Sequence, residues 1–241
     1  MKKNKANKYV FIVIFLFILI FLSPELKNLY SKSENILPTT PIDEIPDILI
    51  LEKDQINEIF SEDIDIDSIK EEYNNQEIVG RLEIPGVFNL IISQAKDNEY
   101  YTYYNIYKKR DVKGSEFLDF RNKVEDKQIN IYGHNSTTYD VPFKKIEKFL
   151  DEDFFNNNQY ILFQHKNGRR IYQIASIKKV DQNSPHMKLN PENRQEHINS
   201  LTTDSINSRN LDYSENTNII VLQTCVTRNS GNYYILVGFE I

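Results

Sequence analysis

The chain contains a single cysteine, Cys225, which follows an apolar run. Residues 219–222 (IIVL) favour a strand that is buried on both faces, and the polar Gln223 and Thr224 indicate that the chain leaves the core at the end of this strand. We therefore expect the thiol at the rim of a sheet. An unpaired cysteine is more often a small buried apolar residue, so Cys225 alone does not establish any chemistry.

A histidine occupies a similar position in a second stretch. Residues 128–132 (QINIY) alternate between polar and apolar, which predicts a strand, and Gly133 and His134 follow it. A thiol and an imidazole that are each held at a strand end are the minimum parts of a Cys-His nucleophilic site. Both isolated groups are mostly neutral at neutral pH, so a nearby cation would be needed to enlarge the reactive fraction that holds thiolate and imidazolium.

The residues around Cys225 and His134 resemble a known family. Residues 221–225 (VLQTC) resemble the Thr-Leu-x-Thr-Cys signature of sortases, the cysteine transpeptidases of Gram-positive cell envelopes, and residues 132–135 (YGHN) resemble their histidine motif. The resemblance to class B sortases spans residues 76–241. It continues, in order, through residues 84–86 (IPG), Gln94, Asp97, Asn98, Tyr100, Tyr101 and residues 114–121 (GSEFLDFR).

The resemblance implies a mechanism and a set of partners. Cys225 would attack the threonine carbonyl of a C-terminal sorting signal of the Asn-Pro-x-Thr type in a surface protein and form a thioester. His134 would protonate the leaving amine and then deprotonate a peptidoglycan precursor amine, which makes the reaction a transpeptidation. Asn98 and Thr224 are the expected substrate-binding residues, and we expect no cofactor and no metal.

The position of the oxyanion-binding arginine departs from the family pattern. Class B sortases place this arginine at the start of the last strand, just after a turn glycine, whereas here Gly231 is followed by Asn232. Arg228, three residues past the thiol, is the only arginine after Cys225, and we predict it as the third catalytic residue. The alternative is that Arg228 is an exposed loop residue, with Asn232 or Arg121 as the next candidates.

Composition excludes several other classes of protein. A net charge of -6 over 241 residues argues against nucleic-acid binding, which usually needs a basic surface. A single cysteine rules out an intramolecular disulfide. The four histidines show no metal-ligand spacing, so we predict no structural zinc, and we expect His165, His186 and His197 to lie away from the thiol.

The N-terminal region predicts a membrane anchor. Residues 1–8 hold four lysines and precede an apolar run, which suggests a cytoplasmic tail, an anchor over residues 9–23 and a proline-containing extracellular linker over residues 24–47. The run covers about 21 Å as a helix, less than the ~30 Å hydrocarbon core, so a signal peptide is the alternative. Because no Ala-x-Ala type site follows, we expect a single-pass protein of the cell membrane with its catalytic domain outside the cell.

The remaining chain reads as helices followed by short strands. Residues 48–75 predict one or two amphipathic helices, and residues 76–241 predict the catalytic domain. We expect a mainly β (α+β), mixed and largely antiparallel barrel, which the resemblance implies is closed and eight-stranded. The long connection over residues 181–217 should carry a helix that begins at Asn190 or Pro191. Its buried side should comprise Ile198, Leu201 and Ile206.

Two classes of function remain open at this point. The first is the sortase-type enzyme. The second is a pilus-associated or catalytically weak relative, or a non-enzymatic surface-binding domain on the same barrel, because fold does not fix function. A Cys225 thiol that faces His134 and a basic group would favour the enzyme, and a buried thiol among apolar neighbours would favour the second class.

Overall fold

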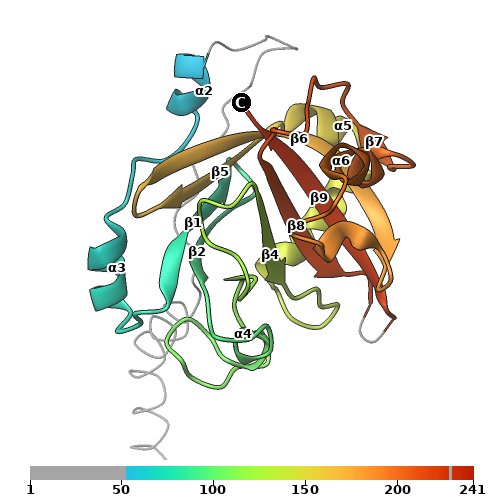
Figure 1. Cartoon of the computed structure of the whole chain (residues 1–241). Coiled ribbons are helices and arrows are strands. Elements are labelled where there is room, and N and C mark those ends of the chain that lie inside the picture. Colours follow the sequence, from blue (N-terminus) through green and yellow to red (C-terminus); the bar gives the residue numbers. More distant parts are fainter. Residues whose placement is uncertain (1–52, 228–229) are drawn as a thin grey trace, which may run out of the picture. The chain divides into compact units, whose positions relative to one another are not determined.

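The computed structural model describes residues 53–227 and 230–241 (Figure 1). Eight strands close into a barrel in the order β5-β1-β2-β3-β4-β8-β9-β6, and pairing of β6 with β5 completes the ring. β7 adds a short ninth strand on β6. The strands are β1 (Ile78–Ile84), β2 (Phe88–Ser93), β3 (Phe117–Leu118), β4 (Gln128–Gly133), β5 (Tyr160–His165), β6 (Gly168–Asp181), β7 (Asn207–Ser208), β8 (Ile219–Cys225) and β9 (Asn232–Glu240).

The predicted closed and mixed eight-stranded barrel is confirmed. Most neighbouring strands are antiparallel, whereas β2 pairs with β3 and β4 pairs with β8 in parallel. A parallel pair cannot be joined by a tight hairpin, so the chain must travel from the end of β4 to the start of β8 through other elements. That detour supplies β5, β6 and the long connection over residues 181–217.

Strand β8 lies at the centre of the core and is buried on both faces. Ile220 and Leu222 belong to the main core cluster, whereas Ile219 and Val221 pack in a second cluster with α6 (Arg194–Thr202). All four side chains are fully buried, and each contributes about 1.5–3 kcal/mol relative to an exposed side chain. The prediction of a strand with two buried faces is confirmed, and α6 is the element that covers the outer face.

Two short helices precede the barrel, as the sequence predicted for residues 48–75. They are α2 (Lys53–Glu58) and α3 (Ile66–Glu72), and the side chain of Asp65 caps the second by accepting from the Asp67 backbone. The loop between them is tied to β1 by Arg81, whose guanidinium donates to the carbonyls of Glu62 (2.6 Å) and Ser61 (3.1 Å). This buried arginine satisfies backbone groups that the loop would otherwise leave unpaired.

The segment after β4 forms η1 (Pro142–Leu150), a 3-10 helix, and then α5 (Glu152–Asn157). Phe143, Ile146 and Phe149 are all fully buried. Their spacing of three residues matches the three residues per turn of a 3-10 helix, so one apolar edge faces the barrel. Asp151 caps α5 by accepting from the backbone N–H of Phe154.

The long connection between β6 and β8 carries η2 (Pro185–Met187), α6 and β7. The helix was predicted to begin at Asn190 or Pro191, but it begins at Arg194 because Asn193 is the N-cap and accepts from Glu196. Ile198 and Leu201 are buried as expected. Ile206 is 49% exposed, so its predicted burial was wrong: it lies past the end of the helix, where the backbone turns toward β6.

The predicted tail, anchor and linker over residues 1–8, 9–23 and 24–47 lie outside the described residues. Among the helices of residues 53–227 and 230–241, none has the length and apolar character that a bilayer crossing needs.

Candidate active site

Two of the three predicted catalytic residues, Cys225 and His134, lie at the same edge of the barrel, because β4 and β8 are parallel neighbours. Their ladder runs from Gln128 opposite Ile219 to Gly133 opposite Thr224, so His134 and Cys225 are the next residues along each strand. The Thr224 hydroxyl closes the ladder by donating to the Gly133 carbonyl at 2.9 Å. Rigid backbone pairing therefore delivers the imidazole and the thiol to one place.

The chain leaves the core later than the sequence indicated. Gln223 and Thr224 are 8% and 1% exposed, and Cys225 is the first half-buried residue of β8. The predicted emergence at Gln223 was wrong, because both polar side chains have partners inside the fold. Burial raises the pKa of the Cys225 thiol, so this environment favours the neutral thiol.

A pocket of about 270 Å³ opens at this edge, and both Cys225 and His134 line it. The other lining residues combine aromatic and aliphatic surface with a few polar groups; they are Asn98, Thr102, Phe117, Tyr132, Gly133, Met187, Gln223, Thr224 and Tyr233. An apolar pocket with a few convergent polar groups is the usual form of a substrate site. Of these described lining residues, none is a lysine or an arginine.

The ring of His134 is oriented by a backbone carbonyl. Its Nε2 lies 2.8 Å from the carbonyl oxygen of Thr102, the third residue of α4 (Tyr100–Tyr103). A carbonyl can only accept, so Nε2 carries the hydrogen and Nδ1 is the ring atom that can accept a proton. Sequence reasoning missed this contact because any residue type supplies the same carbonyl.

Gly114 allows the loop before β3 to lie against this histidine. Its φ of +62° favours glycine, and a Cβ atom there would lie 2.5 Å from the carbonyl oxygen of Tyr101 and 3.1 Å from Cδ2 of His134. Any side chain at this position would therefore push on the histidine ring or on the carbonyl beside it. The glycine that begins the 114–121 segment thus has a steric role at the site.

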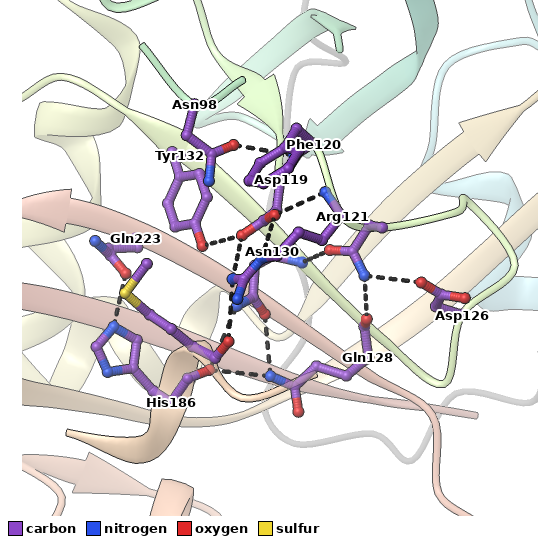
Figure 2. Close-up of polar contacts among 12 residues, drawn as sticks. Asn98, Asp119, Phe120, Arg121, Asp126, Gln128, Asn130, Tyr132, His186 and Gln223 are labelled. Atoms are coloured by element: carbon purple, nitrogen blue, oxygen red, sulfur yellow. Dashed lines mark hydrogen bonds and ion pairs between the residues drawn. The ribbon is translucent and has the colours of Figure 1, made fainter. Parts of the chain in front are cut away.

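One wall of the pocket is formed by Met187 of η2, whose backbone is bonded to an ion pair between the exposed Arg121 and the buried Asp119 (Figure 2). Arg121 donates to Asp119 through Nε (2.9 Å) and Nη2 (2.6 Å), and its Nη2 also reaches the carbonyl of Met187 at 3.1 Å. The Tyr132 hydroxyl donates to the same carboxylate at 2.7 Å. Burial alone would raise the pKa of Asp119, but the hydrogen bonds from Arg121 and Tyr132 outweigh it and lower that pKa.

A second set of hydrogen bonds connects η2 to β4 and β8. The His186 carbonyl accepts from Gln128 (3.0 Å) and Asn130 (3.3 Å) on β4, and the His186 ring donates from Nε2 to Gln223 at 2.7 Å (Figure 2). Burial lowers the pKa of His186, which favours the neutral form of the ring. His186 therefore lies behind the pocket wall, closer to the site than the sequence indicated, although it does not line the pocket.

Two of the other predicted site residues, Asn98 and Thr224, line the pocket. Asn98 lines the pocket, and its Oδ1 accepts from the Phe120 backbone at 2.9 Å, so its Nδ2 is the end that can donate to a ligand (Figure 2). Thr224 also lines the pocket, but its hydroxyl already donates to Gly133. Arg228 lies outside the described residues.

The two next candidates for the arginine role are engaged elsewhere. Arg121 binds Asp119 and Met187 and is not among the residues that line the pocket. Asn232 donates from Nδ2 to the carbonyl of Ser230 at 2.9 Å, inside the turn that precedes β9. Neither side chain is therefore directed at the thiol by the contacts that it makes.

Comparisons with known proteins agree with this geometry. No protein-family model matches the chain. It is 27% identical over 160 residues to sortase B of Staphylococcus aureus (strain NCTC 8325 / PS 47), which covers 63% of this chain. It is 29% identical over 161 residues to sortase B of Listeria monocytogenes serovar 1/2a (strain ATCC BAA-679 / EGD-e), which covers 64% of this chain. The chain spans 64% of the length of each of these curated relatives.

The fold leads to the same group. An X-ray structure of a cysteine-to-serine mutant of Clostridium perfringens sortase B superposes with a TM-score of 0.67 at 26% identity. The match covers 73% of this chain and 87% of that one. In both sequence and fold, the chain is therefore similar to sortase B proteins.

Proposed function

We propose that the chain is a cysteine transpeptidase of the sortase type. The observation that carries the proposal is that Cys225 and His134, placed by adjacent parallel strands, line one pocket. The Thr102 carbonyl leaves Nδ1 of His134 as the basic atom, which is the form a general base requires. The similarity to curated sortase B proteins supports the same reaction class.

The first half-reaction follows from these two groups. The thiol proton of Cys225 passes to Nδ1 of His134, and the sulfur attacks the carbonyl carbon of a threonine in the bound peptide. The tetrahedral intermediate carries its negative charge on oxygen. It collapses with cleavage of the C–N bond, His134 returns a proton to the leaving amine, and the acyl group remains as a thioester on Cys225.

The second half-reaction reuses the same histidine. An acceptor amine attacks the thioester carbonyl and loses a proton to His134, and the Cys225 sulfur departs as the leaving group. The product is a new amide between the peptide and the acceptor. We propose a peptidoglycan precursor amine as this acceptor, which would attach a surface protein to the cell wall.

The neutral thiol that burial favours creates a need for positive charge. We propose that Arg228, outside the described residues and three residues past the thiol, supplies it. A guanidinium near the sulfur would favour the thiolate, and its planar donors would stabilise the oxyanion. The raised pKa of Cys225, with no lysine or arginine among the described lining residues, supports the need for such a group.

The pocket chemistry suits an extended peptide. We propose that Asn98 donates from Nδ2 to a backbone or side-chain oxygen of an Asn-Pro-x-Thr type sorting signal, with Met187 and Tyr233 contacting its apolar parts. Thr224 holds the strand register through Gly133 and contributes its remaining surface to the pocket. A cell-envelope location with residues 9–23 as the membrane anchor completes this proposal.

The test is mass spectrometry of the purified domain after incubation with an Asn-Pro-x-Thr peptide. A thioester adduct on Cys225 is expected, and hydroxylamine should release it by attacking the same carbonyl. The controls are the Cys225→Ala protein and a peptide with the same composition in scrambled order. Absence of any adduct with the sorting peptide, at concentrations that saturate the pocket, would contradict the enzyme.

That negative outcome would favour the second class of function. A half-buried thiol with a raised pKa also fits a catalytically weak relative or a surface-binding domain. Peptide binding without acylation would then be measurable by calorimetry on the same protein.

A further inference from the structure

Asn135, the residue after His134, contacts the backbone of the cysteine. Its Nδ2 donates to the Cys225 carbonyl at 2.8 Å and to Oε1 of Glu147 at 2.6 Å, and the Val226 carbonyl lies 3.4 Å away. An amide nitrogen has two hydrogens, so the two short bonds use its donor capacity. The β4–β8 ladder ends one residue earlier, at Gly133 and Thr224. Asn135 therefore continues the connection between the two strands beyond the last backbone pair.

Glu147 gives this amide a fixed orientation. It belongs to η1, whose neighbouring residues Phe143 and Ile146 are fully buried in the main core cluster. The ring of Phe143 lies directly against the end of β4, because a Cβ on Gly133 would be 2.6 Å from two of its ring carbons. A charge-assisted bond to a carboxylate on such an anchored helix is stronger than a neutral one.

We propose that Asn135 is a positioning residue that holds the Cys225 backbone in register with His134, with Glu147 fixing the Asn135 amide. His134 and Cys225 both follow the last pair of the ladder, where strand ends would otherwise separate. A misplacement of about 1 Å between reacting groups can cost on the order of 10²-fold in rate. The expected effect on turnover rests on the proposed function, whereas the expected effect on the reactivity of the Cys225 thiol does not.

The first test measures the thiol itself. Iodoacetamide alkylates a thiolate: a C–S bond forms, the C–I bond breaks and iodide leaves, and Cys225 is the only cysteine in the chain. In the wild type, transfer of the thiol proton to His134 should give a measurable rate near neutral pH. Asn135→Ala should be about tenfold slower there, with the half-maximal rate moved to higher pH, because the Cys225 backbone is no longer held in register with His134.

A matched control separates positioning from general destabilisation. Asn207 also donates from its amide to two backbone carbonyls, those of Phe149 (2.8 Å) and Leu150 (3.1 Å), and does not line the pocket. Asn207→Ala should lower the melting temperature by a similar amount and leave the alkylation profile unchanged. Equal shifts of the profile in both variants would overturn the proposal.

Glu147 provides a second variant and a conservative rescue. Glu147→Gln keeps an oxygen that can accept from Asn135 and should retain a wild-type profile within about twofold. Glu147→Ala removes that acceptor and should shift the profile in the same direction as Asn135→Ala, by roughly threefold in rate. If Asn135→Ala does not fold, the two Glu147 variants still test the proposal. Identical alkylation profiles for Glu147→Gln and Glu147→Ala would contradict the positioning role.

Peptide turnover gives the final readout and keeps the two proposals distinguishable. In Asn135→Ala, kcat for acylation should fall about tenfold while KM stays within about twofold, because the substrate walls are untouched. A wild-type protein that forms no thioester, but whose alkylation profile still depends on Asn135, would contradict the transpeptidase and leave the positioning role standing. If the wild type turns over peptide and a folded Asn135→Ala protein has the same turnover and alkylation profile, the transpeptidase stands and the positioning role is contradicted.

Discussion

The floor and the wall of the pocket are held in different ways. The floor is the end of the β4–β8 ladder, where backbone hydrogen bonds and fully buried aliphatic residues place His134 and Cys225. The wall is η2, which is tied to the barrel through side-chain bonds to the backbone of His186 and Met187. The floor depends on many equivalent contacts, whereas the wall depends on a few individual side chains.

In the proposed enzyme, this difference would separate catalysis from substrate recognition. Backbone ladders tolerate substitution because every residue type supplies the same donor and acceptor. Buried polar networks tolerate little, since removing one member leaves its partners unpaired in a low dielectric. Substitutions at the ends of the ladder should therefore act on kcat, and substitutions behind η2 should act mainly on KM and on stability.

The largest expected effect lies on the floor. Cys225→Ala should abolish acylation completely while the melting temperature stays within a few degrees of wild type, because the half-buried thiol packs little surface. Peptide cleavage assays and thermal unfolding would measure both. Retained turnover would remove Cys225 as the nucleophile.

His134→Ala should be nearly as damaging. The imidazole serves both proton transfers, so we expect a loss on the order of 10²- to 10⁴-fold in kcat. The control is His197→Ala, because His197 bonds Gln128 in the interior and does not line the pocket. If only a few-fold of activity is lost in His134→Ala, the general base must be another group.

Substitutions of Arg228 test whether this residue acts in catalysis together with His134 and Cys225. Arg228→Ala should lower the acylation rate constant on the order of 10²- to 10³-fold if the guanidinium binds the oxyanion. Arg228→Lys should restore little of that loss, because an ammonium lacks the planar pair of donors. Unchanged kcat in Arg228→Ala would make it an ordinary loop residue and return attention to Asn232 and Arg121.

The wall should respond differently. Asp119→Asn weakens the bonds from Arg121 and Tyr132 and loosens the Met187 backbone, so KM should rise several-fold with kcat within about twofold. A matching loss of kcat would show that the wall also positions the catalytic pair, and the proposed separation would then be wrong.

The same substitution has a pH signature. The folded-state pKa of Asp119 is lowered, so its stabilising contribution is present above the ordinary aspartate pKa and is lost as the pH falls through the lowered value. Acid unfolding of the wild type should therefore include a component that Asp119→Asn lacks. Melting temperatures across the acidic range would measure it, and parallel curves for the two proteins would contradict the assignment.

Local patterns in the sequence were sufficient for much of the fold. The run over residues 219–222 predicted a strand with two buried faces, because four aliphatic residues in succession leave no polar side for solvent. The turn between β5 and β6 lies at Lys166 and Asn167, just before Gly168, and Asp151 caps α5; both follow turn and cap preferences that are properties of the residues themselves. The prediction of a closed eight-stranded barrel came from the family resemblance.

The sequence by itself also determined the chemistry available: one thiol, and one imidazole after a matching strand. Only the tertiary structure decided that these strands are parallel neighbours with ends in register, because that pairing joins residues about ninety positions apart. It also decided that the Thr102 carbonyl orients His134 and that Gln223 is covered by His186. Such contacts leave no local pattern, since a carbonyl is common to all residues and a long-range partner depends on how the whole barrel closes.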